Sequence, residues 1–474
     1  MSPIQTRETH LSWLVLLEDR VYKVKKPVRT EFVDLSTREA RQRNAEDEVR
    51  LNRRLAPDVY LGVATLAGLP GLDEPVVVMR RMPEDRRLAL LAARGDDLAE
   101  QMGDLARRLA TFHLQAPVVP RAGSSAAVLA LWEAGRVQLG VHGRGVLDPE
   151  RVEQVAALGA RYVTGRPGLF DGRADRVREG HGDLLADDVF LLDDGPRVLD
   201  CLEFDLALRA GDVLSDVAFL AMDLEHLGRA DLAEVLLRVH RAEIGDDWPP
   251  SLADHWVAYR AWVRAKVACL RVEQGGAEQA AQARDLLDLA VRRIRRATVR
   301  LVLIGGAPGT GKSTLAAELR DRTGCELLRS DVVRKELAGL EPTASATAAP
   351  GEGLYAPEAT QRTLEALLRR ARELLVHGRS VILDASWASP VWREAADDLA
   401  RECEAEQVRL CAVIPDEVAD ARLRARTGDA SDATPEAAAW LRERFAPWPQ
   451  AREVATDRPP AELADELAGE LLHT

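Results

Sequence analysis

The chain has 474 residues, 46% of them hydrophobic and 30% charged, a balance typical of a globular protein with about two to four domains. It has no apolar run of the roughly 18 residues that a membrane helix needs, no secretory signal pattern at its N-terminus and only five scattered cysteines, so we expect a cytoplasmic protein without membrane segments, a disulfide scaffold or a zinc cluster. The net charge of −13 argues against nucleic acid as a partner, because proteins that coat a phosphate backbone usually carry a basic surface.

The N-terminal part of the chain contains a strand pattern with two lysines on one face. Residues 18–28 read EDRVYKVKKPV, and the period of two places Lys23 and Lys25 on the same side of the strand. Residues 36–55 then have the pattern of a helix, in which Glu48 is the best candidate for a carboxylate that pairs with Lys23. The alternative is a lysine and a glutamate that are both solvated at the surface.

Residues 181–200 read HGDLLADDVFLLDDGPRVLD and contain six aspartates, three of which, Asp183, Asp188 and Asp200, are candidates for chemistry around a predicted β-hairpin at 189–202. Asp188 follows Asp183 by five residues, and Asp200 ends the second strand of the hairpin. Phosphoryl transfer in protein-kinase-type sites needs one carboxylate that orients the acceptor hydroxyl and two oxygen ligands that hold Mg²⁺. The spacing predicts these roles here, and an ordinary Asp-rich turn is the alternative.

This segment resembles the aminoglycoside phosphotransferase (choline-kinase-like) family, whose signature is H-G-D-x-x-x-x-N followed by a second aspartate. The resemblance implies that Lys23 positions ATP, that Asp183 is the catalytic base, and that Asp188 and Asp200 bind metal. The chain departs from the signature in having Asp188 in place of the asparagine, Leu185 in place of a common histidine, and no glycine-rich nucleotide loop. These departures leave open a nucleotide-binding pseudokinase as well as an active kinase.

An amphipathic helix pattern at 278–297 ends the first predicted domain, 1–297. The second predicted domain, 298–474, alternates strands and helices to about residue 415, which is typical of a parallel α/β sheet. The expected fold class is therefore an α+β protein-kinase-like domain followed by an α/β P-loop NTPase domain with a parallel five-stranded sheet. The two-domain order resembles kinase-like proteins of unassigned substrate that are fused to a P-loop kinase.

A phosphate-binding motif lies directly after the first strand of the second domain. Residues 306–313 read Gly-Ala-Pro-Gly-Thr-Gly-Lys-Ser, between an apolar strand and a helix pattern, which is the full G-x-x-x-x-G-K-S motif in its expected context. The main-chain amides and the helix N-terminus bind phosphates in such a turn, the lysine reaches the terminal phosphates and the serine hydroxyl binds Mg²⁺. The predicted nucleotide-binding residues are Gly306, Ala307, Pro308, Gly309, Thr310, Gly311, Lys312, Ser313 and Thr314, with Ser313 also a metal ligand.

Two more strand patterns in this domain end in aspartate. One is expected to end at Asp331, with Arg334 one helical turn later, and the other at Asp384, which fits a Walker-B-like carboxylate that orients Mg²⁺. The S-D-x-x-R element resembles small P-loop kinases related to polynucleotide 5′-kinase, gluconate kinase and zeta toxins, which implies that Asp331 is the general base and that Arg334 binds the substrate. Helix-capping aspartates are the alternative for both strands.

Residues 420–434 resemble the lid of the same kinases. Arg422 and Arg426 lie four residues apart on a predicted short helix and therefore share a face, from which they could stabilise charge on the transferred phosphoryl group. A solvated run of arginines is the alternative.

Taken together, the sequence predicts an ATP-dependent kinase with two nucleotide sites that uses ATP and Mg²⁺ and transfers the γ-phosphoryl group to a hydroxyl of a small molecule. Two alternatives stay open: a nucleic-acid 5′-end kinase, which the net negative charge of both domains disfavours, and a P-loop kinase regulated by an N-terminal pseudokinase. Neither the acceptor nor the oligomeric state follows from the sequence.

Overall fold

The computed structural model describes residues 4–9, 11–30, 33–66, 73–341, 344, 351–425, 431 and 433–473. The chain forms two compact units. The first comprises residues 1–152, 171–248 and 256–290, and the second comprises residues 153–170, 249–255 and 291–474. None of the helices in the described ranges combines the length and the apolar character needed to cross a lipid bilayer.

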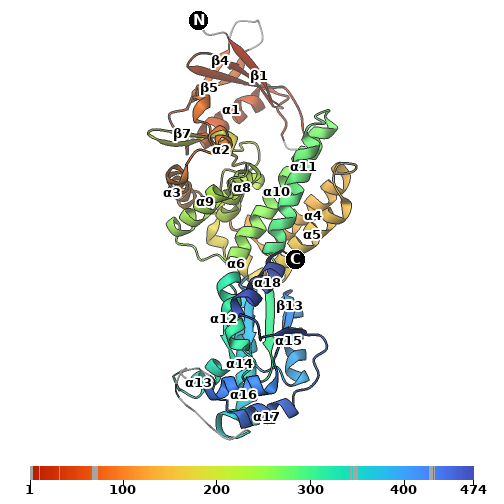
Figure 1. The fold of residues 1–474 in the computed structure, drawn as a ribbon. Helices are drawn as coiled ribbons and strands as arrows, with labels where there is room; N and C mark the ends of the chain where they lie inside the picture. Colours follow the sequence, from red (N-terminus) through yellow and green to blue (C-terminus); the bar gives the residue numbers. More distant parts are fainter. Residues whose placement is uncertain are drawn as a thin grey trace. The chain divides into compact units, whose positions relative to one another are not determined.

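In chain order, the strands are β1 (Gln5–Glu8), β2 (Ser12–Leu16), β3 (Arg20–Lys25), β4 (Tyr60–Leu66), β5 (Glu74–Arg80), β6 (Val177–Glu179), β7 (Val189–Leu192), β8 (Gly195–Val198), β9 (Ala210–Asp212), β10 (Arg300–Gly305), β11 (Glu326–Arg329), β12 (Val381–Asp384), β13 (Glu406–Val413) and β14 (Arg452–Ala455). The helices are α1 (Arg38–Asn52), α2 (Leu88–Arg94), α3 (Ala99–Gln115), α4 (Ser125–His142), α5 (Pro149–Thr164), α6 (Pro167–Asp171), α7 (Leu206–Arg209), α8 (Val213–His226), α9 (Ala230–Glu243), α10 (Pro250–Glu273), α11 (Gln279–Arg296), α12 (Lys312–Thr323), α13 (Ser330–Leu337), α14 (Pro357–Val376), α15 (Pro390–Glu402), α16 (Asp416–Ala425), α17 (Pro435–Glu443) and α18 (Pro460–His473). Figure 1 labels most of them along the chain.

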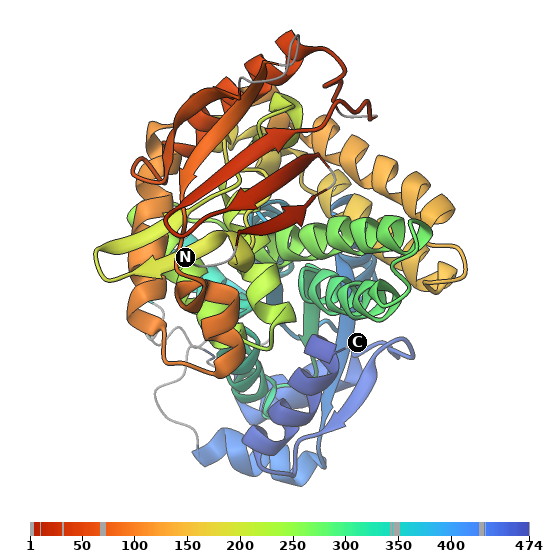
Figure 2. The same cartoon turned by 90° about the horizontal axis from the view of Figure 1, so that it is seen from above.

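The first unit begins with an antiparallel sheet in the strand order β1-β2-β3-β5-β4, and β1, β2 and β3 lie side by side in Figure 2. Helix α1 starts at Thr37, whose side chain accepts a hydrogen bond from the main-chain N–H of Ala40 at 3.1 Å. This capping satisfies one of the free amides of the first turn. Apolar side chains of α1 pack with those of β3, β4 and β5 in one buried cluster, which fixes α1 against the sheet. Both lysines of the predicted strand lie on β3, and Glu48 lies on α1.

Helices dominate the rest of the first unit. The predicted hairpin at 189–202 is confirmed, because β7 and β8 pair antiparallel with a turn at Asp193 and Asp194. Helix α8 is buried along nearly its whole length and packs against α9, which also packs against α3. Helix α8, to which the segment before Asp183 is hydrogen-bonded, is therefore part of the buried core.

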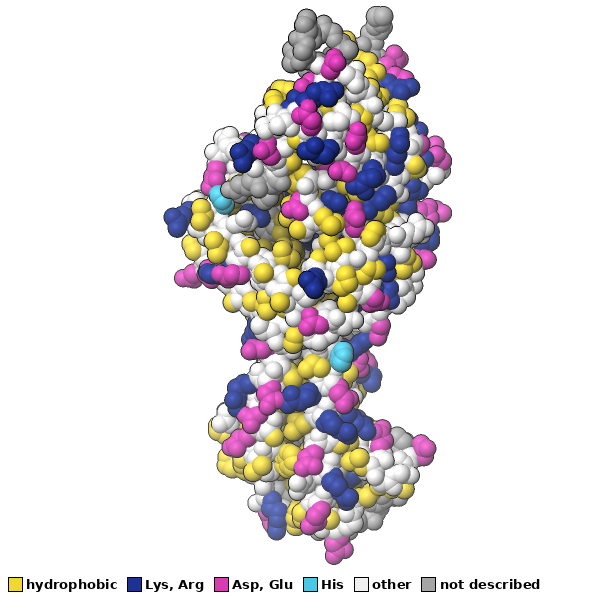
Figure 3. All heavy atoms as spheres, turned by 180° about the vertical axis from the view of Figure 1, so that it is seen from behind, with side chains coloured by type: hydrophobic (Ala, Val, Ile, Leu, Met, Phe, Trp, Pro, Cys, Tyr) yellow, Lys and Arg dark blue, Asp and Glu magenta, His cyan; other side chains and the backbone are white. Residues whose placement is uncertain are grey.

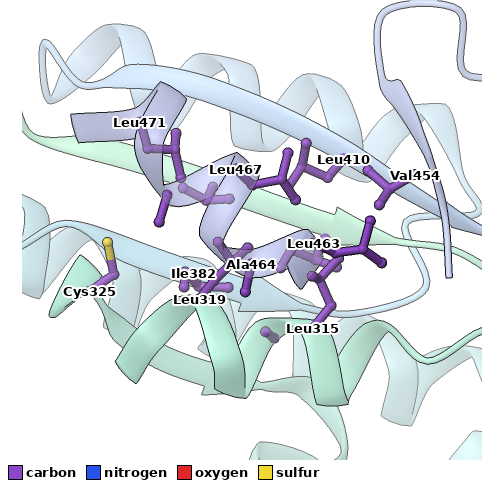
Figure 4. Packing of buried hydrophobic residues seen from close by; sticks show 14 residues of the cluster. Leu315, Leu319, Cys325, Ile382, Leu410, Val454, Leu463, Ala464, Leu467 and Leu471 are labelled. Carbon is purple, nitrogen blue, oxygen red and sulfur yellow. The ribbon is translucent and has the colours of Figure 1, made fainter. Parts of the chain in front are cut away.

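The second unit is built on a parallel sheet in the order β11-β12-β10-β13-β14. The prediction of an α+β region followed by an α/β region with a parallel five-stranded sheet is thus confirmed. Figure 4 shows the core on one face of this sheet, where α12 and α18 bring leucines together with Ile382, Leu410 and Val454. Because the strands are parallel, their carboxyl ends meet at one edge of the sheet, and in register Asp384 lies opposite both Ile304 and Arg329.

One expected strand end differs from the structure. We expected the second strand of this sheet to run to Asp331, but β11 ends at Arg329 and α13 begins at Ser330. Asp331 therefore lies in the first turn of α13, where a carboxylate is favoured by the helix dipole. The shift keeps Asp331 at the same edge of the sheet.

On the face of the molecule shown in Figure 3, acidic and basic side chains alternate and neither sign forms a continuous field.

Candidate active sites

The phosphate-binding turn of the second unit links β10 to α12. Gly306, Gly309 and Gly311 have φ values of +132°, +83° and +82°, in the left-handed region that glycine adopts without strain. A methyl group at Gly309 would lie 2.6 Å from the main-chain oxygen of Ala419, so the turn also needs glycine for space. The Lys312 Nζ donates a hydrogen bond to the main-chain oxygen of Ala307 at 3.3 Å, within the same turn. The predicted residues 306–314 thus form one continuous turn that opens α12.

The carboxylate at the end of β12 lies beside this turn. Asp384 is 4% exposed and accepts a hydrogen bond from the Nε of Arg329 at 3.2 Å. Burial raises the pKa of Asp384, while Lys312, the neighbouring Ser313 hydroxyl and Arg329 oppose this rise. The structure therefore brings together the lysine, the serine and the aspartate that the sequence assigned to phosphate and Mg²⁺.

Asp331 and Arg334, two further predicted residues of the second unit, lie on α13. Asp331 and Arg334 form an ion pair within the first turns of α13, and the guanidinium of Arg334 stacks 4.7 Å from the centre of the Tyr355 ring. Both side chains are mostly buried, and the carboxylate of Asp331 interacts electrostatically with Asp384. The expected base and substrate-binding arginine thus form a connected pair at the edge that carries the phosphate turn.

A cavity of about 130 Å³ adjoins the phosphate turn, and the sequence did not predict all of its lining. Arg422 reaches it from α16 and donates a hydrogen bond to the main-chain oxygen of Thr456 at 2.9 Å. Thr456 and Arg458, which follow β14, also line the cavity. In the sequence, the one indication that these two residues line the site is that they follow the last parallel strand, because the carboxyl ends of parallel strands meet at one edge of the sheet. Arg426, the second predicted lid arginine, lies outside the described residues.

In the first unit, Lys23 connects the sheet to α1 and to the segment after β8. Its Nζ lies 2.8 Å from Glu48 Oε1 and 2.9 Å from Asp200 Oδ1. Burial would lower the pKa of Lys23, but Asp200 and Glu48 raise it well above its usual value. Lys25 also contacts Glu48, at 2.6 Å, and reaches Glu203 at 2.7 Å. Glu48 therefore pairs with both lysines, whereas the sequence analysis assigned it to Lys23 alone.

The main chain of the predicted catalytic loop in the first unit is hydrogen-bonded to Asp216 of α8. Its carboxylate accepts hydrogen bonds from the main-chain N–H groups of His181 at 2.7 Å and Gly182 at 2.9 Å. His113 Nε2 lies 3.0 Å from the same carboxylate, and His113 Nδ1 lies 2.9 Å from His240 Nε2. Sequence reasoning missed this buried network, because none of these supporting side chains belongs to a recognisable motif.

The carboxylates of Asp183, Asp188 and Asp200 lie close enough to interact electrostatically. Burial and the nearby carboxylates of Asp200 and Asp183 raise the pKa of Asp188 well above its ordinary value, and partial burial raises the pKa of Asp183, which Arg264 opposes. Carboxylate oxygens are ligands that a hard divalent cation prefers, but the Lys23 ammonium already pairs with Asp200 and lowers the pKa of its carboxyl. Asp200 adopts a φ of +64°, which is uncommon for a residue other than glycine, and its N–H donates to the Tyr60 hydroxyl at 3.1 Å. Across the ranges that the structure describes, however, no group of three or more His, Cys, Asp or Glu side chains is arranged so that it could hold a metal ion, and this includes these three carboxylates.

Comparison with known proteins gives one family model and several relatives. Residues 301–448 match a family described as an AAA domain. The uncharacterized proteins Rv2004c of Mycobacterium tuberculosis and Mb2027c of Mycobacterium bovis are each 41% identical to this chain over 463 residues, which cover 96% of this chain and 93% of each relative. The similarity therefore extends over both units.

Solved structures also resemble parts of the chain. A structure of APH(2")-IIia with GDP and kanamycin has a TM-score of 0.42 and 16% identity, and covers 61% of this chain and 93% of that one. A sugar kinase from Janibacter sp. HTCC2649 has a TM-score of 0.28 and 22% identity, and covers 37% of this chain and 96% of that one.

Proposed function

We propose that this chain, which belongs to one family with the mycobacterial proteins Rv2004c and Mb2027c, is an ATP-dependent phosphotransferase with two nucleotide sites. The observation that carries the proposal is the phosphate turn, in which three left-handed glycines precede Lys312 and Ser313 beside the buried Asp384. Both sites are proposed to transfer the γ-phosphoryl group of ATP to a hydroxyl of a small molecule.

In the second unit, the main-chain amides of the turn and Lys312 would bind the phosphates, and Ser313 and Asp384 would hold Mg²⁺. When bound, the cation would neutralise charge on the phosphate oxygens. Asp331, oriented by its ion pair with Arg334, would take the proton of the acceptor hydroxyl. The acceptor oxygen then forms a bond to the γ-phosphorus, and the bond from this phosphorus to the β-phosphate oxygen breaks, so that ADP leaves.

In the first unit, Lys23 would orient the nucleotide phosphates from a position fixed by Glu48. Asp183 would take the acceptor proton, and Asp188 and Asp200 would hold Mg²⁺, which would neutralise charge on the phosphate oxygens. The hydrogen bonds that Asp216 accepts from the main chain would keep the catalytic loop in place while these groups act.

The test uses γ-labelled ATP and a pool of small metabolites with the full chain, Lys312→Ala and Asp183→Asn. We expect each substitution to abolish a different set of labelled products, because each removes one site. Arg320→Ala serves as a matched control for Lys312→Ala, since Arg320 is an exposed cation on the same helix, α12. Wild-type protein that neither retains ATP with magnesium nor labels any metabolite would contradict the proposal.

A second function for the first unit is supported by one contact. Lys23 lies 2.9 Å from Asp200 Oδ1, an oxygen that a metal would otherwise use, and this arrangement favours a nucleotide-binding regulator of the P-loop unit. Under this alternative, Asp183→Asn leaves every labelled product unchanged. Loss of any product in that variant would contradict the regulatory role.

A further inference from the structure

Helix α10 brings two arginines to the predicted catalytic base of the first unit. The Arg264 Nη1 lies 3.9 Å from Asp183 Oδ1, and Arg260, one helical turn earlier, also interacts electrostatically with Asp183. Since i and i+4 positions share a face of a helix, both arginines lie on the side of α10 that faces Asp183. The surroundings of the base are therefore basic on this side.

The two arginines differ in what they already bind. Arg260 donates from Nε to the main-chain oxygen of Ser215 at 2.9 Å, and its guanidinium lies 4.7 Å from the centre of the Phe219 ring. Arg264 is 15% exposed and, within the described ranges, donates no hydrogen bond to a protein group; its one ion pair is the 3.9 Å contact with Asp183. A guanidinium carries five N–H donors, so Arg264 has donors left for a ligand.

Two carboxylates interact with Arg264, those of Asp183 and Asp223, and each has another role. Asp223 also interacts with Arg264, but it accepts a hydrogen bond from the main-chain N–H of Ala186 at 2.8 Å and so supports the loop. Asp183 must leave an oxygen free for the acceptor proton. An ammonium group at this position would meet two arginines, whereas a carboxylate or phosphate could accept two parallel hydrogen bonds from Arg264.

We propose that Arg264 binds an anionic group of the acceptor, so that the first unit phosphorylates a hydroxyl of an acidic small molecule rather than of a cationic amine. This inference rests on the proposed kinase activity of the first unit. In the step, Asp183 takes the hydroxyl proton, the hydroxyl oxygen bonds to the γ-phosphorus, and the bond from this phosphorus to ADP breaks. Arg264 acts on a part of the acceptor that does not react.

The test uses the full chain with Lys312→Ala, so that only the first unit can transfer phosphate. A metabolite extract is separated by ion exchange into anionic, neutral and cationic fractions, and each is incubated with γ-labelled ATP. We expect label only in products of the anionic fraction. Prior phosphatase treatment of this fraction distinguishes the two sources of charge, because it removes phosphomonoester acceptors and leaves carboxylate acceptors.

Variants of Arg264 then test its role directly. Arg264→Gln should raise the KM for the labelled acceptor about 10- to 100-fold, since hydrogen bonds to charged groups are worth about 1.5–3 kcal/mol each. It should leave ATP retention unchanged, and Arg264→Lys should restore part of the affinity. Arg271→Gln, an exposed arginine on the same helix, is the matched control and should have no effect.

Three results would overturn the inference in distinguishable ways. Labelling of the neutral or cationic fraction with unchanged KM in Arg264→Gln would show that Arg264 does not select an anion. An equal fall in kcat for every acceptor, with KM unchanged, would place Arg264 on the transferred phosphoryl group instead. Lack of label in all fractions would overturn the proposed activity of the first unit itself. Should Arg264→Gln unfold, Arg264→Lys and the fraction assay still decide the question.

Discussion

Replacing Asp216 by asparagine removes the charge that holds the predicted catalytic loop of the first unit while keeping the shape of the side chain. Asp216 is 4% exposed and accepts hydrogen bonds from two consecutive main-chain amides and from His113. Burial alone would raise the pKa of Asp216, but His113, His181 and the hydrogen bonds that they make hold it well below its usual value. The carboxylate is therefore ionised in the folded protein at neutral pH, and every donor around it needs an acceptor.

An asparagine supplies only one acceptor oxygen, and its NH₂ group must face at least one N–H donor. Hydrogen bonds to a charged group contribute about 1.5–3 kcal/mol each, and removing one partner of a buried charged pair costs about 3–5 kcal/mol. We expect Asp216→Asn to lower the free energy of unfolding of the first unit by about 3–5 kcal/mol, as measured by urea denaturation.

The control is Asp231→Asn, which changes an exposed aspartate that pairs with Arg229 at the surface of the same unit. Surface ion pairs contribute about 0–1 kcal/mol, so this variant should unfold almost like the wild type. Phosphotransfer by the first unit should also fall in Asp216→Asn at temperatures where the protein is still folded, because the loop with Asp183 is no longer fixed. A loss of stability equal to that of Asp231→Asn, with full activity, would refute the role assigned to Asp216.

Two further predictions concern the second unit. Gly309→Ala should lower ATP retention, measured by filter binding, to the level of Lys312→Ala, because φ is +83° there and the new methyl group would meet the main-chain oxygen of Ala419 at 2.6 Å; retention equal to that of the wild type would contradict the geometry of the turn. His255 is buried, and burial together with Arg166 lowers its pKa to about 3. Because the unfolded histidine binds a proton near pH 6.5 and the folded one does not, stability falls as pH falls, by about 2 kcal/mol from pH 7 to 5. Urea denaturation of His255→Phe should show a pH dependence weaker by this amount, and an identical dependence would contradict a buried neutral histidine.

The elements that the sequence predicted well are those whose pattern is local. The hairpin at 189–202 and the helix at 278–297 follow from short-range alternation and spacing, and they match β7–β8 and α11. The phosphate turn was predictable for the same reason, because its glycines, Lys312 and Ser313 are contiguous in sequence and the strand and helix around them are strong signals. In these segments, local preference and the final fold agree.

The residues that the sequence did not predict depend on contacts between distant segments. Asp216 lies in a helix that is apolar on nearly all sides, and its partner His113 is 103 positions earlier in the chain. Lys25 is two residues from Lys23 and looks equivalent in the pattern, yet it also pairs with Glu203, 178 positions away. The end of β11 was misplaced because Ser330 and Asp331 suit the start of a helix as well as the end of a strand.

The two candidate sites consequently differ in how they are assembled. In the second unit, the residues of the phosphate turn are contiguous in sequence, although Thr456, 146 positions away, donates a hydrogen bond to the main-chain oxygen of Thr310. In the first unit, Lys23 joins Glu48 and Asp200, which are 25 and 177 positions away. Long-range pairs form only when the surrounding fold is complete, since the chain entropy of bringing distant segments together must be offset by the whole unit. A destabilising change anywhere in the first unit should therefore weaken its proposed nucleotide site.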